Sequence, residues 1–185
     1  MAPRPLKPLD SPARGRPIDR RVRIGHGHLK VSDLDRALAF YCGVLGFELM
    51  QRIGHDAAFL AAGGYHHHLG LNTWESGGGG RPAPGTTGLY HVAILYPDRA
   101  SLADALLRLD AAGVPLTGAS DHGVSEALYL DDPDGNGLEL YRDRPPEAWP
   151  RNGDGSLAMF TRRLDVAELR AEGQAADCRL RLSVR

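Results

Sequence analysis

The sequence has few cysteines and no long apolar run. Its 185 residues contain two cysteines, Cys42 and Cys178, which lie far apart and lack CxxC spacing. This excludes a small disulfide-stapled secreted scaffold and suits a reducing compartment, so we expect a cytoplasmic protein. No apolar run approaches the roughly 20 residues of a membrane span, and the first residues lack the apolar segment of a signal peptide. We therefore expect no membrane association.

Neither sign of charge is in excess. The chain carries 22 Lys and Arg against 23 Asp and Glu, a formal net charge of -1. This balance gives no broad field to attract a phosphate backbone, so nucleic acid is not an expected partner. An apolar content of 42% fits one globular domain.

Composition divides the chain into three parts. Residues 1–20 are rich in Pro and Arg and have almost no apolar periodicity, which predicts a disordered lead-in. Residues 21–144 are expected to form the folded domain. Residues 145–185 are charged and weakly periodic, apart from the helical stretch LDVAELRAEG, and are interpreted as a peripheral C-terminal tail.

The domain contains one pattern twice. Residues 21–75 predict a strand at 23–31, a helix capped by Ser32, and strands in VLGFELMQRI, AAFLAAGG and HHHLGLNTW. After a Gly- and Pro-rich loop, residues 87–144 predict a strand, a helix and three strands again. The fold class is therefore predicted as α+β: two paired βαβββ modules forming a curved mixed sheet around a cleft, with helices on the outer face.

Strand alternation sends nitrogen donors away from the helices. In the first strand Leu29 and Val31 share the helix side, which leaves His26 and His28 opposite. In GLYHVAILYP the same argument turns His91 away from the helices. His26 and His91 occupy equivalent positions in the two modules.

The last strand supplies a carboxylate. In GLELY, Leu138 and Leu140 turn inward, and Glu139 faces the other side. One such group is more often structural, but burying several unpaired groups costs about 1–3 kcal/mol each, so a shared cleft is expected to bind something. Two imidazoles and a carboxylate are typical of non-haem Fe(II) enzymes, and His26, His91 and Glu139 are the predicted metal ligands.

Three stretches resemble a known family. HGHLKVSDLDRALAFYCGVLGFEL, GLYHVAIL and YLDDPDGNGLELY resemble the vicinal oxygen chelate superfamily, which builds a metal cleft from paired βαβββ modules. The resemblance covers roughly residues 24–144. HHHLGLNTW, DHGVSEALYL and the following DRP resemble, more narrowly, the type I extradiol dioxygenases related to catechol 2,3-dioxygenase.

The resemblance implies cleavage of a small catechol-type aromatic by dioxygen, with Fe(II) as the expected metal and Mn(II), Zn(II) or Ni(II) as alternatives. It implies that Tyr129 and His122 hold the substrate oxygens. It also implies a catalytic acid/base within the HHH run. Strand alternation favours His68 or His66, whereas a shift of one residue selects His67. From the residues alone, Tyr129 could equally be a strand aromatic and His122 a turn residue.

Other functions remain open at this level. The same cleft could serve a glyoxalase I-like isomerase or a thiol transferase, or could bind a drug or other small molecule without chemistry. The paired modules could also close within one chain or exchange between two, which leaves a homodimer open.

Overall fold

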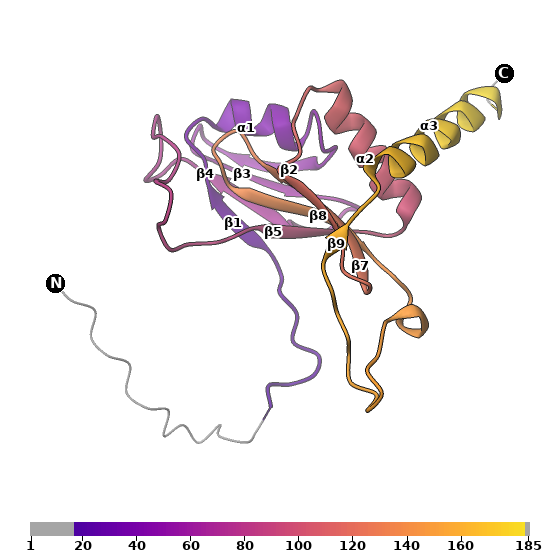
Figure 1. Cartoon of the computed structure of the whole chain (residues 1–185). Coiled ribbons are helices and arrows are strands. Elements are labelled where there is room, and N and C mark those ends of the chain that lie inside the picture. The colour runs from indigo at the N-terminus through magenta and orange to yellow at the C-terminus, as the bar shows by residue number, and fades with distance from the viewer. Residues whose placement is uncertain (1–16, 184–185) are drawn as a thin grey trace.

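The computed structural model describes residues 17–183, with side chains up to residue 176. Residues 1–16, most of the predicted disordered lead-in, lie outside this range. Within it both predicted modules are present, and the α+β class is confirmed (Figure 1). The first module consists of β1 (Gly27–Lys30), α1 (Leu34–Tyr41), β2 (Glu48–Ile53), β3 (Ala57–Ala61) and β4 (Leu69–Asn72). The second consists of β5 (Val92–Tyr96), α2 (Arg99–Ala111), β6 (Gly118–Asp121), β7 (Ser125–Asp131) and β8 (Gly137–Asp143).

The strands form two mixed sheets. The first has the order β1-β4-β3-β2 and the second the order β5-β8-β7-β6-β9. β1 and β5 are parallel to β4 and β8, and the other pairings are antiparallel. The two sheets come together at their edges, since a Cβ atom added at Gly27 of β1 would lie 3.6 Å from Cγ2 of Val92 in β5.

The caps of the two helices correct one prediction. The N-cap of α1 is Asp33 and not Ser32, and the Asp33 side chain accepts a hydrogen bond from the Arg36 amide at 3.0 Å. Asp98 caps α2 in the same way, through the Ser101 amide. An aspartate in extended backbone satisfies a free amide at each helix start, so the repeat extends to the caps. The Ser32 hydroxyl instead donates to Asp134, 2.6 Å away.

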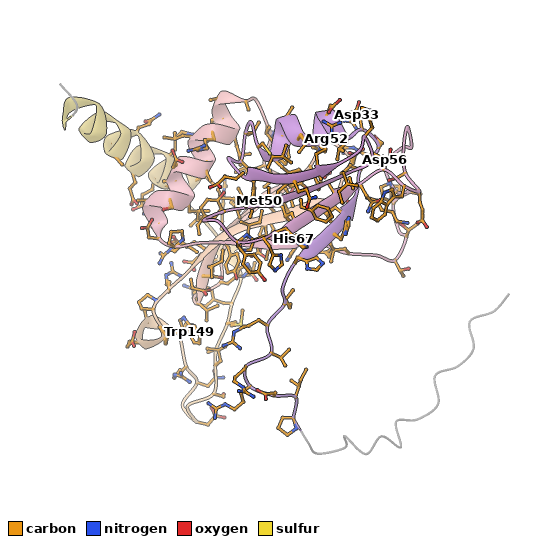
Figure 2. All side chains as sticks on the ribbon, turned by 180° about the vertical axis from the view of Figure 1, so that it is seen from behind. Asp33, Met50, Arg52, Asp56, His67 and Trp149 are labelled. Carbon is orange, nitrogen blue, oxygen red and sulfur yellow. The ribbon has the colours of Figure 1, made fainter. Side chains whose placement is uncertain are left out.

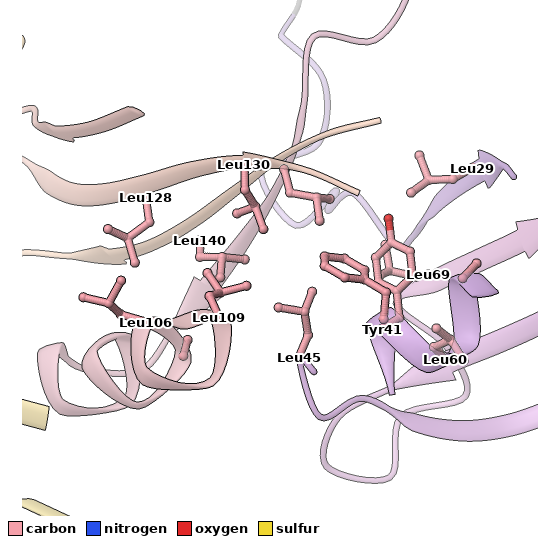
Figure 3. Packing of buried hydrophobic residues seen from close by; sticks show 14 of the residues in the cluster. Leu29, Tyr41, Leu45, Leu60, Leu69, Leu106, Leu109, Leu128, Leu130 and Leu140 are labelled. Carbon is pink, nitrogen blue, oxygen red and sulfur yellow. The ribbon is translucent and has the colours of Figure 1, made fainter. Parts of the chain in front are cut away.

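One apolar core joins the modules. The helices cover one face of the strands (Figure 1), and Leu60 and Leu69 of the first module belong to the same buried cluster as Leu106 and Leu140 of the second (Figure 3). At the centre of this core, the buried Tyr41 hydroxyl donates to Asp132 at 3.0 Å. Burial, and then the negative charge of Asp132, raise the pKa of Tyr41. This hydrogen bond links α1 to the turn that precedes β8.

The C-terminal segment is an integral part of the domain, which corrects its interpretation as a peripheral tail. A short helix (Pro146–Ala148) is followed by β9 (Arg162–Arg163), which pairs with β6 in the second sheet, and by α3 (Val166–Ser183), which packs on α2. Leu164 and Leu169 are buried in the core. Weak periodicity hid this, because α3 contributes few apolar side chains and its other contacts are ionic, such as Arg170 with Asp110.

Candidate metal centre

The predicted nitrogen donors stand at the starts of equivalent strands. β1 begins at Gly27 and β5 at Val92, so His26 and His91 each immediately precede a strand that was expected to include them. Because β1 and β5 adjoin, these positions lie at the junction of the two sheets. The two histidines therefore lie just before the N-terminal ends of β1 and β5 and not within these strands.

Glycine at position 137 allows His91 to approach β8. A Cβ atom added to Gly137 would overlap the Tyr90 carbonyl oxygen and would lie 3.4 Å from Cα of His91. Backbone contact this close tolerates only glycine. No role was predicted for Gly137, although NGLELY, with glycine two residues before the carboxylate, carries the signal.

Glu139 and His91 are brought together. Nε2 of His91 lies 2.9 Å from Oε2 of Glu139, and the two side chains are 29% and 13% exposed. This is an ordinary hydrogen-bond distance. It also equals the spacing of about 3 Å between two adjacent ligands of an octahedral ion with bonds near 2.1 Å, so the pair could hold a metal ion without large movement. Nδ1 of His91 is buried without a hydrogen-bond partner among the described residues. The imidazole is thus held chiefly through the nitrogen that faces the carboxylate.

His26 is placed differently. Its ring contacts that of His67, with centroids 4.4 Å apart and planes tilted by 53°. Within residues 17–183 there is no group of three or more His, Cys, Asp or Glu side chains arranged to hold a metal ion. The structure therefore assembles two of the three predicted ligands, and the membership of His26 stays a prediction.

A chain of polar contacts leads outward from Glu139. Tyr129 of β7 is opposite Glu139 in the register, and its hydroxyl donates to Oε1 at 3.1 Å. The same hydroxyl lies 2.8 Å from Nε2 of His122, and Nδ1 of His122 lies 3.1 Å from the carbonyl oxygen of Phe160. Tyr129 thus stands beside the carboxylate and His122 contacts Tyr129, while their role in holding substrate oxygens stays a prediction.

The contact of His122 with Phe160 was not predicted. Gly123, with φ of +78°, turns the chain next to His122, and a Cβ atom there would lie 2.7 Å from the Phe160 ring. The loop is anchored by Asp121, which accepts from the Gly123 amide at 2.8 Å and pairs with Arg144 at 2.5 Å. The partner of His122 lies 38 residues away in irregular chain, so no local pattern could have found it.

The environment keeps Tyr129 protonated. Burial, and then the negative charge of Glu139, raise the pKa of Tyr129 to about 12. At neutral pH the phenol is therefore a hydrogen-bond donor. A pocket of about 380 Å³ opens beside it, lined by Tyr90, His91, Thr117, Tyr129 and Leu138 among others. Its size fits a small aromatic molecule.

The three consecutive histidines precede β4 and face different neighbours. His67 is half-buried, contacts the His26 ring and lies 5.0 Å from the Phe59 ring; Figure 2 shows it beside the strands. His68 is exposed, accepts from the Ala62 amide through Nδ1 at 3.3 Å and packs on Tyr65. The preference for His68 or His66 required a strand through all three histidines, but β4 begins only at Leu69.

The fold and this pair of side chains define a class of protein: a two-module α+β chain with a histidine and a carboxylate at the junction of its sheets. Residues 23–140 match the model of the Glyoxalase/Bleomycin resistance protein/Dioxygenase superfamily. The chain belongs to this family.

Two sequence relatives are dioxygenases by name. The chain is 41% identical to "Catechol-2,3-dioxygenase" of Bacillus subtilis (strain 168) over 155 residues, 84% of this chain and 53% of that protein. It is 33% identical to "Biphenyl-2,3-diol 1,2-dioxygenase 3" of Rhodococcus globerulus over 65% of this chain and 63% of that protein. The chain thus spans about half to just under two thirds of the length of these relatives.

Other relatives carry a different name, and solved structures share the fold. A "Probable lactoylglutathione lyase" of Synechocystis is 28% identical over 62% of this chain and 91% of that protein. The glyoxalase/bleomycin resistance protein/dioxygenase domain from Frankia sp. EAN1pec superposes with a TM-score of 0.57 at 24% identity, over 68% of this chain and 94% of that one. Within residues 17–183, no helix combines the length and apolarity needed to span a membrane.

Proposed function

We propose that this chain is a metal-dependent extradiol dioxygenase that cleaves the ring of a catechol-type substrate with dioxygen. The observation that carries the proposal is the pairing of His91 with Glu139 at 2.9 Å, at the place where the two modules meet. The 41% identity to a protein named catechol-2,3-dioxygenase supports the same chemistry.

The residues that would hold the metal are His91, Glu139 and His26. One carboxylate with two imidazoles suits Fe(II) or Mn(II) and leaves coordination positions open. Bound Fe(II) would supply a single centre at which catechol oxygens and dioxygen meet, together with Lewis acidity toward the catechol. All other steps fall to the side chains around it.

Tyr129 would orient the Glu139 carboxylate, and its hydroxyl hydrogen would determine how His122 can bond to it. Its hydroxyl donates to Oε1 of Glu139, which leaves Oε2 free to face His91. A phenol has one hydrogen, so while Tyr129 donates to Glu139, Nε2 of His122 must carry its own hydrogen to complete the 2.8 Å contact. Nδ1 of His122 lies 3.1 Å from the Phe160 carbonyl oxygen and 3.3 Å from the Thr161 hydroxyl, which hold the ring in place. Through its contact with the hydroxyl of Tyr129, which lines the pocket, His122 would help to stabilise negative charge on a substrate oxygen.

His67 would be the acid/base of the HHH run. It is half-buried and its ring contacts those of His26 and Phe59, whereas His68 is exposed and packs on Tyr65. An imidazole whose unperturbed pKa lies near neutral pH can take a catechol proton and return it later. This assignment replaces His68 or His66, the choice predicted from strand alternation.

The test is oxygen uptake by full-length protein reconstituted anaerobically with Fe(II). Uptake with a panel of catechols, accompanied by a yellow ring-opened product, is expected. No uptake across the panel, together with isomerisation of a hemithioacetal in the presence of Zn(II) or Ni(II), would favour the lactoylglutathione lyase relatives instead and refute the proposal.

A further inference from the structure

A second donor pair lies outside the His91–Glu139 pair. Nδ1 of His66 and Nδ1 of His67 are 2.8 Å apart. With one hydrogen between them, the two rings form an ordinary hydrogen bond. The same spacing also fits two adjacent ligands of an octahedral ion, since such ligands lie about 3 Å apart at bond lengths near 2.1 Å.

Aromatic contacts hold both rings. His67 is packed between the rings of His26 and Phe59, at 4.4 and 5.0 Å. His66 stacks on Tyr65, with centroids 4.1 Å apart and planes tilted by 33°. Each imidazole is therefore supported by a neighbour, which reduces the entropy cost of fixing the rings around an ion.

The pair is accessible and provides only nitrogen. His66 is exposed in the loop between β3 and β4, so a cation can reach the pair from solvent. Imidazole donors without a carboxylate favour borderline ions such as Ni(II), Cu(II) and Zn(II), and disfavour Mg(II) and Ca(II). Binding needs no net loss of a proton, because neutral histidine can shift its hydrogen from Nδ1 to Nε2.

We propose that His66 and His67 form a second, solvent-accessible binding site for a borderline divalent transition-metal ion, next to the proposed iron site, with which it shares His67. The ion would be held by two protein nitrogens and by water. Since His67 also contacts the His26 ring, an ion bound here would fix a side chain predicted to serve the first site.

The experiment measures Ni(II) binding to full-length, chelator-treated protein by equilibrium dialysis, in a Glu139→Ala background that disables the first site. The background protein is expected to bind Ni(II), and adding His66→Gln is expected to weaken the apparent dissociation constant at least tenfold. His55→Gln is the matched control, because His55 is an exposed histidine in the turn between β2 and β3. It should leave the constant unchanged, and excess Mg(II) should not displace Ni(II).

Two results would overturn the proposal: no Ni(II) binding by the Glu139→Ala protein, or equal affinity in the His66→Gln and His55→Gln proteins. Both variants change exposed side chains, and far-UV circular dichroism checks that they remain folded. The proposed dioxygenase function is read separately, from iron content and oxygen uptake with Glu139 intact.

Discussion

Tyr129 and Glu139 lie opposite each other on β7 and β8, and the tyrosine hydroxyl donates to Oε1 of the carboxylate at 3.1 Å. The other carboxylate oxygen faces His91 at 2.9 Å. A carboxylate whose two oxygens have different partners has a fixed orientation.

Replacing Tyr129 with Phe should lower kcat/KM for catechol cleavage by about 10–100-fold, because an outer hydrogen bond that orients a metal ligand is typically worth that much. Oxygen uptake with the iron-loaded enzyme measures this. Tyr141→Phe is the control, since Tyr141 lies two residues from Glu139 on the same face of β8. Equal losses in the two variants would assign the effect to packing and not to the hydrogen bond.

Changing His67 to Gln should reduce kcat by about 10²–10⁴-fold, the usual contribution of a general acid/base, and remove the acidic limb of the pH–rate profile. His68→Gln should retain most of the activity, because the described contacts of His68 are with Ala62 and Tyr65. The reverse ranking of the two variants would restore the assignment made from strand alternation.

Gly137→Ala should displace the Tyr90–His91 backbone from β8, because the added methyl group would overlap the Tyr90 carbonyl. We expect weaker iron binding, measured as iron retained per chain after gel filtration. In Gly118→Ala, the control, the new methyl would meet Tyr129 at an ordinary 3.6 Å. If Gly137→Ala retained all its iron, the close approach of His91 to β8 would not be needed for iron binding.

Asp121→Asn should remove part of the acid sensitivity of folding. The Arg144 hydrogen bond is the main cause that holds the pKa of Asp121 below its usual 3.8. A carboxylate with a lowered folded-state pKa stabilises the protein above pH 3.8 and loses that contribution as pH falls through its folded value. Urea unfolding from pH 5 downward should therefore show a shallower loss of stability in Asp121→Asn. An unchanged slope would mean that this ion pair adds nothing to folding.

Periodicity predicted the two βαβββ modules and the face of Glu139, since those depend only on local alternation. Tyr129 was singled out by the family resemblance and not by periodicity. It failed where tertiary contacts decide. Three strands begin later than predicted, which leaves His26, His68 and His91 just outside them. The N-cap of α1 is Asp33 instead of Ser32. The link from His122 to Phe160 and the burial of Leu164 and Leu169 depend on how the C-terminal segment folds back, which a local pattern does not encode.

The most direct test of the dioxygenase proposal is the iron content of Glu139→Ala and His91→Ala after anaerobic reconstitution, measured per chain beside the wild type. We predict about one iron per chain in the wild type, with loss of most iron and of catechol-dependent oxygen uptake in both variants. Iron at the wild-type level in either variant, with oxygen uptake intact, would contradict the account.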